Sequence, residues 1–231
     1  SLLTDYTNDA SITSYTEGDT TKMYTFSHPA TAQTEALTDY RYIGNSPNNY
    51  IIFNDELWRI IGVFTTEKEN GEKEQLVKIV RNEGVKNLSW ASNSINEWSN
   101  ASLQILLNNG DYYKKNGDYI TTGLNNIAKE QIENVKWYLG GSSSASHNSQ
   151  SYYAFERGNS VYSGHSLSYV GKVGLLYASD YAYTFSLGVN EKCNADTYHC
   201  NDGNPSASYL FTGSEQWTLT LSSGSPNIVF L

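Results

Sequence analysis

Short apolar runs separated by polar turns mark the first third of the chain. The runs 50–53 and 58–64 flank a short polar turn, and a third run, 75–81, follows a charged turn. Runs of this length that are rich in β-branched and aromatic residues are typical of β-strands. The pattern predicts hairpins in one sheet, with 22–26 as an edge strand. His28-Pro29 ends that strand, because proline donates no backbone hydrogen bond.

Apolar residues at intervals of three and four then predict two amphipathic helices. Ser99 is placed to cap the first helix, and Asn108-Asn109-Gly110, which accept left-handed backbone, end it. The second helix is predicted over about 122–135. The residues expected to face the core are Ala101, Leu103, Ile105, Leu106 and Leu107 in the first helix, and Leu124, Ile127, Ala128, Ile132 and Val135 in the second.

Loops dominate the second half. A strand is predicted over 135–139, and 140–151 follows as a Gly/Ser/Asn-rich loop with almost no apolar side chain. Strands, then helices, then long loops that carry short strands are typical of an α+β domain. The remaining predicted strands are 170–178, 217–221 and 228–231.

The domain organisation is simple. A chain of 231 residues fits one substantial domain, and we assign 22–231 to it. The segment 1–21 is polar without an apolar period, so we interpret it as an N-terminal arm or linker. No run of 18 apolar residues occurs, so no membrane span is expected. The start at Ser1 without a signal peptide predicts a mature product or a trimmed chain, with any anchor upstream.

Composition narrows the compartment and the partners. Lys and Arg total 15 against 24 Asp and Glu, a net charge of −9, which disfavours nucleic acid as a partner. Charged residues make up 17%, below the quarter or so that is usual, while Tyr (19) and Gly (18) are abundant. This composition favours a secreted or cell-surface protein, and we expect an extracellular location.

The two cysteines, Cys193 and Cys200, are separated by six residues of a polar loop. They could close a small disulfide ring in an oxidising compartment. A metal cluster with His199 and Asp202 is the alternative, but the Cys-x6-Cys spacing matches no usual zinc site. The disulfide is therefore favoured, and no metal site is predicted.

Aromatic residues supply the candidate binding surface. The five tryptophans lie among apolar residues and are expected in the core. Several tyrosines lie instead in Ser/Gly/Asn-rich loops, where amphipathic rings among small polar residues are the composition of recognition surfaces. The alternative is that each ring only holds its loop in place. The predicted ligand-binding residues are Tyr152, Tyr153, Tyr162, Tyr169, Tyr183, Tyr198 and Tyr209.

Other polar residues are assigned structural or solvent-facing roles. The four histidines, His28, His147, His165 and His199, lie in polar sequence without a catalytic motif and are expected to face solvent. Glu156-Arg157 and Asp180 could be mistaken for catalytic machinery. Buried acids and arginines more often tie loops to a sheet, so their loss should unfold the domain.

Eight segments are informative as an ordered set. They are Tyr40-Arg41-Tyr42-Ile43-Gly44, Asn48 to Asn54, Trp58 to Phe64, Ser102-Leu103 with Leu106-Leu107-Asn108, Trp137-Tyr138-Leu139-Gly140-Gly141, Phe155-Glu156-Arg157-Gly158, Val173 to Tyr181, and Gln216-Trp217-Thr218-Leu219. In this order they resemble uncharacterised surface proteins of Firmicutes and Mollicutes-like gut bacteria. The domain of those proteins is related to the C-type-lectin-like fold, a distant version of which occurs in formylglycine-generating enzymes. The resemblance runs from about Met23 to the end of the chain.

The resemblance implies a C-type-lectin-like α+β domain with two helices, small antiparallel sheets and long loops, whose second-half loops carry the binding surface. Some lectin-like domains bind calcium, and Asp196, Asn201, Asp202 and Asn204 offer oxygens for it. The loop lacks the Glu-Pro-Asn and Trp-Asn-Asp signatures, so a solvated turn is preferred and no cofactor is predicted. No Arg- and Ser-rich segment surrounds the cysteines, which argues against formylglycine-generating chemistry.

One departure from the resembled proteins affects assembly. There, the Trp-Thr-Leu segment is followed by further strands that return to the sheet, whereas this chain stops at Phe230-Leu231. The expectation is either an early end or an empty sheet position whose unpaired backbone groups another chain could fill.

The sequence therefore predicts a non-enzymatic, adhesin-like module that binds a glycan or a protein through its second-half loops. The alternative is a subunit of an extracellular filament or pilus, in which the N-terminal arm of one copy pairs with the vacated sheet edge of the next.

Overall fold

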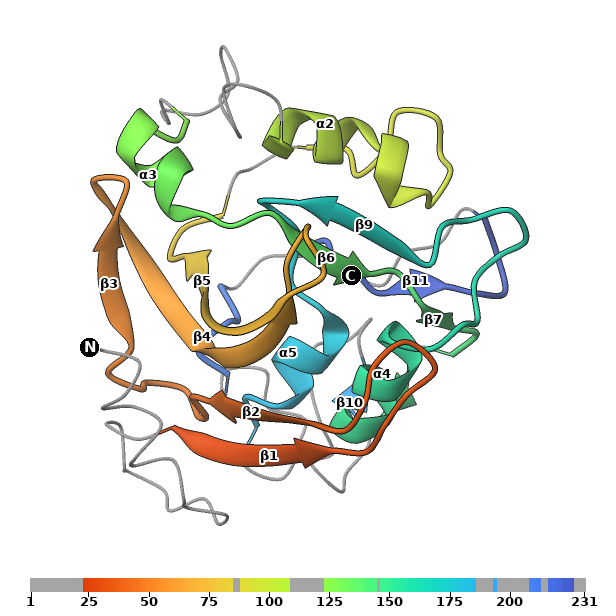
Figure 1. Cartoon of the computed structure of the whole chain (residues 1–231), viewed down its shortest axis with the longest axis horizontal. Helices are drawn as coiled ribbons and strands as arrows, with labels where there is room; N and C mark the ends of the chain where they lie inside the picture. Colours follow the sequence, from red (N-terminus) through yellow and green to blue (C-terminus); the bar gives the residue numbers. More distant parts are fainter. Residues whose placement is uncertain are drawn as a thin grey trace.

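The computed structural model describes residues 23–84, 88–108, 123–144, 146–185, 193–194, 208–212 and 216–226. These residues form a mixed α+β fold with one five-stranded antiparallel sheet, three two-stranded pairings and four α-helices (Figure 1). The α+β class predicted from the sequence is confirmed.

The large sheet is built by the first third of the chain. β2 and β3 share one edge of the long central strand β4, β1 extends the sheet beyond β2, and β5 takes the other edge of β4. The predicted strand 50–53 and the predicted hairpin are confirmed, although β1 begins two residues later than predicted and β2 was not predicted. The bounds are β1 Tyr24–His28, β2 Leu37–Arg41, β3 Tyr50–Phe53, β4 Glu56–Glu67 and β5 Lys73–Arg81.

Local chemistry explains the turns and the bulge of this sheet. Asn54 and Asp55, between β3 and β4, have φ of 56° and 58°, the left-handed pair that a tight hairpin requires and that Asn and Asp tolerate. The ladder between β4 and β5 shifts register between Ile60 and Gly62. Gly62 lies directly against the Tyr40 carbonyl, where a Cβ would overlap that oxygen.

The helices of the first half differ from their predictions. They are the 3-10 turn η1 (Trp98–Asn100), α2 (Ser102–Asn108) and α3 (Asn126–Gln131). Glu97, not Ser99, caps η1, because its carboxylate accepts the Ser99 N–H. α2 ends at Asn108 as predicted, but α3 has only six residues. Ile105 and Ile127 are exposed, so the prediction that both face the core is wrong.

The second half contains two helices that the sequence did not predict. α4 begins inside the predicted loop, and α5 begins where the strand predicted over 170–178 should end. β6 confirms the strand predicted over 135–139, while 228–231 lies outside the described residues. The bounds are β6 Val135–Tyr138, β7 Gly141–Ser142, β8 Ser146–His147, α4 Ser149–Glu156, β9 Ser168–Gly171, α5 Ala178–Ala182, β10 Cys193–Asn194 and β11 Leu221–Ser222.

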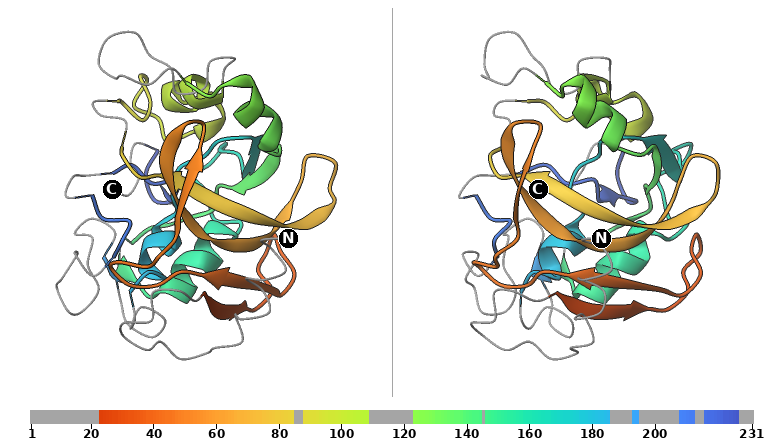
Figure 2. Two further views of the ribbon diagram at one scale, coloured as in Figure 1. Left: turned by 90° about the vertical axis from the view of Figure 1, so that its left-hand side faces the viewer. Right: turned by 60° about the vertical axis from the view of Figure 1, so that its left-hand side comes forward.

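Short pairings connect distant segments of the second half. β6 pairs with β9 and β10 with β8 in antiparallel fashion, whereas β11 pairs with β7 in parallel. α4 and α5 lie near the β1–β2 end of the large sheet, and α2 and α3 lie at the opposite end (Figures 1 and 2). One apolar cluster gathers around Trp90, Trp98 and Leu219, and a second packs on the sheet around Tyr42, Ile61 and Val63.

Candidate functional site

A cleft of about 1570 Å³ opens along β5. Residues 76–84, from β5 and the turn after it, and residues 172–177, which lead into α5, line it without interruption. We call this space the β5 cleft. It draws on segments from both halves of the chain, so its walls form only when the domain folds.

The outer edge of β5 is open toward this cleft. Among the strands of the described residues β5 pairs with β4 alone. In an antiparallel pair, alternate residues direct their N–H and C=O groups away from the partner strand. Within the described residues, the outward-facing backbone groups of 73–80 have no strand partner, so an extended segment placed in the cleft could pair with them.

Three tryptophans supply apolar walls. Trp58 comes from β4, Trp137 from β6 and Trp217 from the segment before β11, and all three line the cleft. Hydrogen bonds fix two of the indoles: Trp137 Nε1 donates to the Gly171 carbonyl and Trp217 Nε1 to the Leu88 carbonyl, each at 2.9 Å. Trp217 remains 37% exposed, so its ring is accessible to a ligand.

Buried charges form a continuous chain under the cleft. His28 Nε2 lies 2.9 Å from Asp39 Oδ2, which also accepts from Arg41 Nη2 at 2.8 Å. Arg41 Nη1 donates to Asp180 Oδ1 at 3.1 Å, and Lys78 Nζ donates to Asp180 Oδ2 at 2.5 Å. Opposite charges alternate along the chain, which is how a fold accommodates ions removed from water.

Burial and neighbouring charges shift the pKa values of these linked ionisable groups. Burial alone would raise the pKa of Asp39, but the charge of Arg41 and the hydrogen bond from His28 lower it to about 2. Burial lowers the pKa of His28, although its contact with Asp39 opposes the shift. Burial would also raise the pKa of Asp180, and the charges of Lys78 and Arg41 outweigh it and lower that pKa. Both carboxylates are therefore charged at neutral pH.

Lys78 is a member of this row of buried charges that lies at the cleft surface. Its ammonium lies 4.8 Å from the centre of the Tyr177 ring and 5.6 Å from that of Trp137, and its residue lines the cleft. Burial lowers the pKa of Lys78 despite the attraction of Asp180. A cation held among aromatic faces can still attract a negative group.

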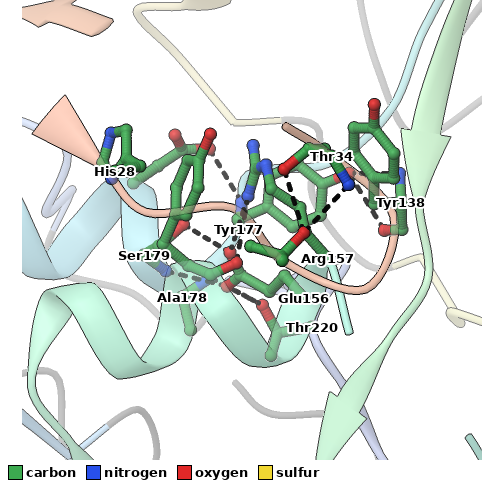
Figure 3. Close-up of polar contacts among 12 residues, drawn as sticks. His28, Thr34, Tyr138, Glu156, Arg157, Tyr177, Ala178, Ser179 and Thr220 are labelled. Atoms are coloured by element: carbon green, nitrogen blue, oxygen red, sulfur yellow. Dashed lines mark hydrogen bonds and ion pairs between the residues drawn. The ribbon is translucent and has the colours of Figure 1, made fainter. Parts of the chain in front are cut away.

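Glu156 and Arg157 lie side by side at the end of α4 (Figure 3). The Glu156 carboxylate accepts hydrogen bonds from the Ser179 N–H at 3.0 Å, the Ser179 hydroxyl at 2.5 Å and the Thr220 hydroxyl at 2.7 Å, and a longer one from Arg157 Nη1 at 3.5 Å. It thereby joins α4, α5 and the segment before β11. The predicted burial of Glu156, Arg157 and Asp180 is confirmed.

The predicted tyrosine surface is not assembled by the fold. Four of these tyrosines follow the alternative and are buried: Tyr152 and Tyr153 face the core from α4, and Tyr183 and Tyr209 are buried as well. Tyr153 and Tyr209 nevertheless line the β5 cleft with a small part of their surface.

Tyr162 and Tyr169 do not line the cleft. Tyr162 is partly exposed beside His165, Tyr169 is half-buried and accepts a hydrogen bond from Gln104, and Tyr198 lies outside the described residues. The tyrosines that loop composition singled out therefore do not share one surface.

Two of the other sequence expectations are corrected by burial. His28, expected to face solvent, is buried and stacks on Tyr153 with ring centres 3.6 Å apart. Trp90 and Trp98 are in the core as predicted, whereas Trp217 is exposed. His199, Cys200 and the proposed calcium ligands Asp196, Asn201, Asp202 and Asn204 lie outside the described residues, and the Cys193 side chain is not described.

Catalytic and metal chemistry has few candidate groups in the described part of the chain. The Ser142 hydroxyl lies 2.7 Å from His147 Nε2, a distance suited to a nucleophile and its base. Neither residue lines the β5 cleft. Within the described residues no three His, Cys, Asp or Glu side chains are placed to hold a metal ion.

Sequence reasoning missed the β5 cleft and its cations. The one available signal was Lys78, a single charge within the apolar run 76–80. A strand with one inward lysine needs a buried partner or a cavity, but the sequence does not show that Asp180 and the segment 172–177 lie beside it.

Comparison with known proteins finds no relative of this chain. No protein-family model matches the chain. No curated protein and no solved structure matches it either. In the described residues, none of the helices has the length and apolar character that crossing a membrane requires.

Proposed function

We propose that this chain is a non-enzymatic binding module of a bacterial cell surface, with a C-type-lectin-like domain, that holds an extended polypeptide ligand in the β5 cleft. The observation that carries the proposal is the open edge of β5 along the cleft. An added strand gains main-chain hydrogen bonds from such an edge, while neighbouring pockets receive its alternate side chains. The cleft replaces the loop tyrosines as the binding surface.

Protein is favoured over glycan as the ligand for a geometric reason. Sugars bind to exposed aromatic faces with hydrogen-bonding side chains around them. Of the cleft tryptophans Trp217 is the most exposed, so the cleft offers a sugar mainly this one ring. A continuous strand edge offers a sugar no matching pattern, whereas it matches a peptide backbone at every second residue. A glycan remains the competing outcome of the experiment below.

The arrangement of the ionisable groups supports binding rather than catalysis. Asp180 accepts from Arg41, Lys78 and the Tyr177 N–H, and Glu156 accepts from Ser179 and Thr220. Carboxyl groups whose oxygens are engaged in this way hold a fold together and leave few lone pairs for a substrate.

The filament subunit is a second candidate, and the same strand edge favours it. A segment of a second copy, such as its N-terminal arm, would pair with β5 in place of a foreign peptide. The two proposals differ in whether the purified chain assembles by itself.

Peptide and glycan arrays probed with the purified chain test the proposal. Val77 of β5 is 41% exposed and lines the cleft, and Ile127 of α3 is 70% exposed and does not. We expect captured peptides to bind Val77→Lys more weakly by roughly tenfold or more, because the new ammonium must be desolvated in the cleft. Ile127→Lys is the matched control and should bind as the unmodified chain does.

The outcomes separate the candidates. Capture of glycans alone, or peptide capture that Val77→Lys leaves unchanged, would overturn the proposal. Filaments in negative-stain images of the unmodified chain that disappear in Val77→Lys would favour the subunit instead.

A further inference from the structure

Arg157 is a buried cation at the surface of the β5 cleft. The residue is only 7% exposed, yet it lines the cleft. Its guanidinium stacks on the Tyr153 ring at 3.6 Å and lies 5.3 Å from the centre of the Tyr177 ring. Such stacking holds the planar group in place and leaves its edge, where the N–H donors lie, for hydrogen bonds.

The hydrogen bonds of this guanidinium are few and long. Nη1 donates to the Tyr153 carbonyl and to Glu156 Oε2, both at 3.5 Å, the outer limit for such a contact. Nε has no hydrogen-bond partner among the described residues. A guanidinium has five N–H donors, and a buried one that leaves them unused is costly.

The nearby carboxylates are committed elsewhere. Glu156, the nearest one, directs its oxygens mainly at Ser179 and Thr220, and burial raises its pKa although the Arg157 charge opposes that shift. Asp39 and Asp180 are paired with Arg41 and Lys78. By contrast with Arg41, which contacts two carboxylates at 2.8 and 3.1 Å, Arg157 contacts one carboxylate of the described residues, that of Glu156, at the longer distance of 3.5 Å.

A second cation lies on the same ring. Lys78 Nζ is 4.8 Å from the centre of the Tyr177 ring, and one of its N–H groups reaches Asp180. Lys78 and Arg157 both line the cleft and face Tyr177. Two cations near one aromatic ring repel each other; Asp180 offsets the charge of Lys78, and an anion beside Arg157 would lower the repulsion further.

We propose that Arg157 and Lys78 form an oxyanion subsite of the β5 cleft, which takes a carboxylate of the bound polypeptide. A carboxylate matches the fork of the guanidinium and can accept two parallel hydrogen bonds from it. An acidic side chain on a strand added to β5 is the source. This inference rests on the proposed function, because it names the chemistry that the same cleft selects.

Proton–nitrogen NMR of the arginine Nε–H groups tests the subsite without the polypeptide. The chain has four arginines, so the spectrum contains few signals. Sodium acetate, the bare carboxylate, is added against sodium chloride at equal ionic strength. We expect the Arg157 signal to shift in a saturable way. Arg59 Nε, which donates to Asn49 Oδ1 at 2.6 Å, is an internal control and should not move.

Variants separate the subsite from general charge effects. Arg157→Lys should weaken acetate binding by roughly tenfold, because an ammonium cannot make the forked contact. Lys78→Met should also weaken it. Should these variants not fold, the through-space contact with the Tyr153 ring assigns the Arg157 signal in the unmodified chain, and its response to acetate alone decides.

Each outcome has a defined meaning. An Arg157 signal that acetate leaves in place overturns the subsite, even if the arrays capture peptides. A stronger response to phosphate overturns the carboxylate assignment, and a much stronger response to glucuronate overturns the polypeptide source. Saturable acetate binding supports the subsite, and it does so independently of the array result, on which the proposed function stands or falls.

Discussion

Arg41 illustrates how neighbouring residues stabilise a charged side chain in the protein interior, where burial alone is unfavourable. Its side chain is almost fully buried and lies between Asp39 and Asp180, with Phe64 and Tyr183 each 4.5 Å from the guanidinium carbon. Asp39 lies two residues away on the same strand, but Asp180 is 139 residues away and reaches Arg41 only through the fold. Removing one member of such a chain leaves an uncompensated buried charge.

We therefore expect Arg41→Met to lower the free energy of unfolding by about 3–5 kcal/mol. Lys73→Met, which breaks the exposed pair of Lys73 with Glu35, is the matched control and should change it by less than about 1 kcal/mol. Urea unfolding followed by tryptophan fluorescence measures both. Equal effects of the two substitutions would refute the structural role of the buried ion pairs of Arg41.

His28 and Asp39 should make stability depend on pH. The folded pKa of His28 is lowered, so the unfolded chain takes up a proton first, and the stability that His28 contributes is lost as pH falls from about 6.5. The folded pKa of Asp39 is also lowered, and its contribution is lost as pH falls from about 4 toward 2. The urea midpoint should decline in both windows.

The His28→Gln variant checks the assignment of the first window. Its midpoint should be nearly flat between pH 7 and pH 5, whereas His165→Gln, outside this network, should keep the decline. A decline of the same slope in all three proteins would assign the effect to other groups.

At the scale of elements, the close contact between β2 and β4 depends on a glycine, Gly62, which has no side chain. A Cβ on Gly62 would overlap the Tyr40 carbonyl and lie 3.0 Å from the Arg41 Cα. Because backbone atoms, not a movable side chain, fill that space, Gly62→Ala must separate the two strands. We expect it to lower the free energy of unfolding by about 3 kcal/mol.

Gly84→Ala is the control for this substitution, because nothing lies within 4 Å of a Cβ at that position. It should change stability by less than about 0.5 kcal/mol. Thermal and urea unfolding of both variants give the comparison, and a Gly62→Ala protein as stable as Gly84→Ala would contradict the close approach of β2 to β4.

Elements also show where local pattern fails. The hairpin of β4 and β5 was predicted because two apolar runs and a charged turn define it locally. α3 was overestimated, since Leu124 and Ile132 are apolar for reasons of tertiary packing and lie outside the helix. α4 was missed because its Ser and Tyr residues have weak helical preference, and the side chain of Asn148 together with packing on α5 stabilises it.

At the scale of the whole molecule, Glu156 joins three segments that are far apart in sequence. It bonds Ser179, 23 residues away, and Thr220, 64 residues away. Glu156→Ala would leave three buried donors without their acceptor, and we expect a loss of about 3–5 kcal/mol. Glu130→Ala on exposed α3 is the control and should be nearly neutral. Calorimetry measures both, and a mild effect of Glu156→Ala would mean that the second half is held together elsewhere.

The sequence by itself determined the class of fold, the hairpin strands and the residues with strong local preference, because apolar period and turn chemistry act between near neighbours. Only the tertiary structure decided which polar and aromatic residues are buried. Tyr153 and His28 lie in polar sequence, and they stack in the core because α4 meets β1 there. The β5 cleft arises in the same way: its walls, its open strand edge and its two cations come from segments that meet only when the chain folds.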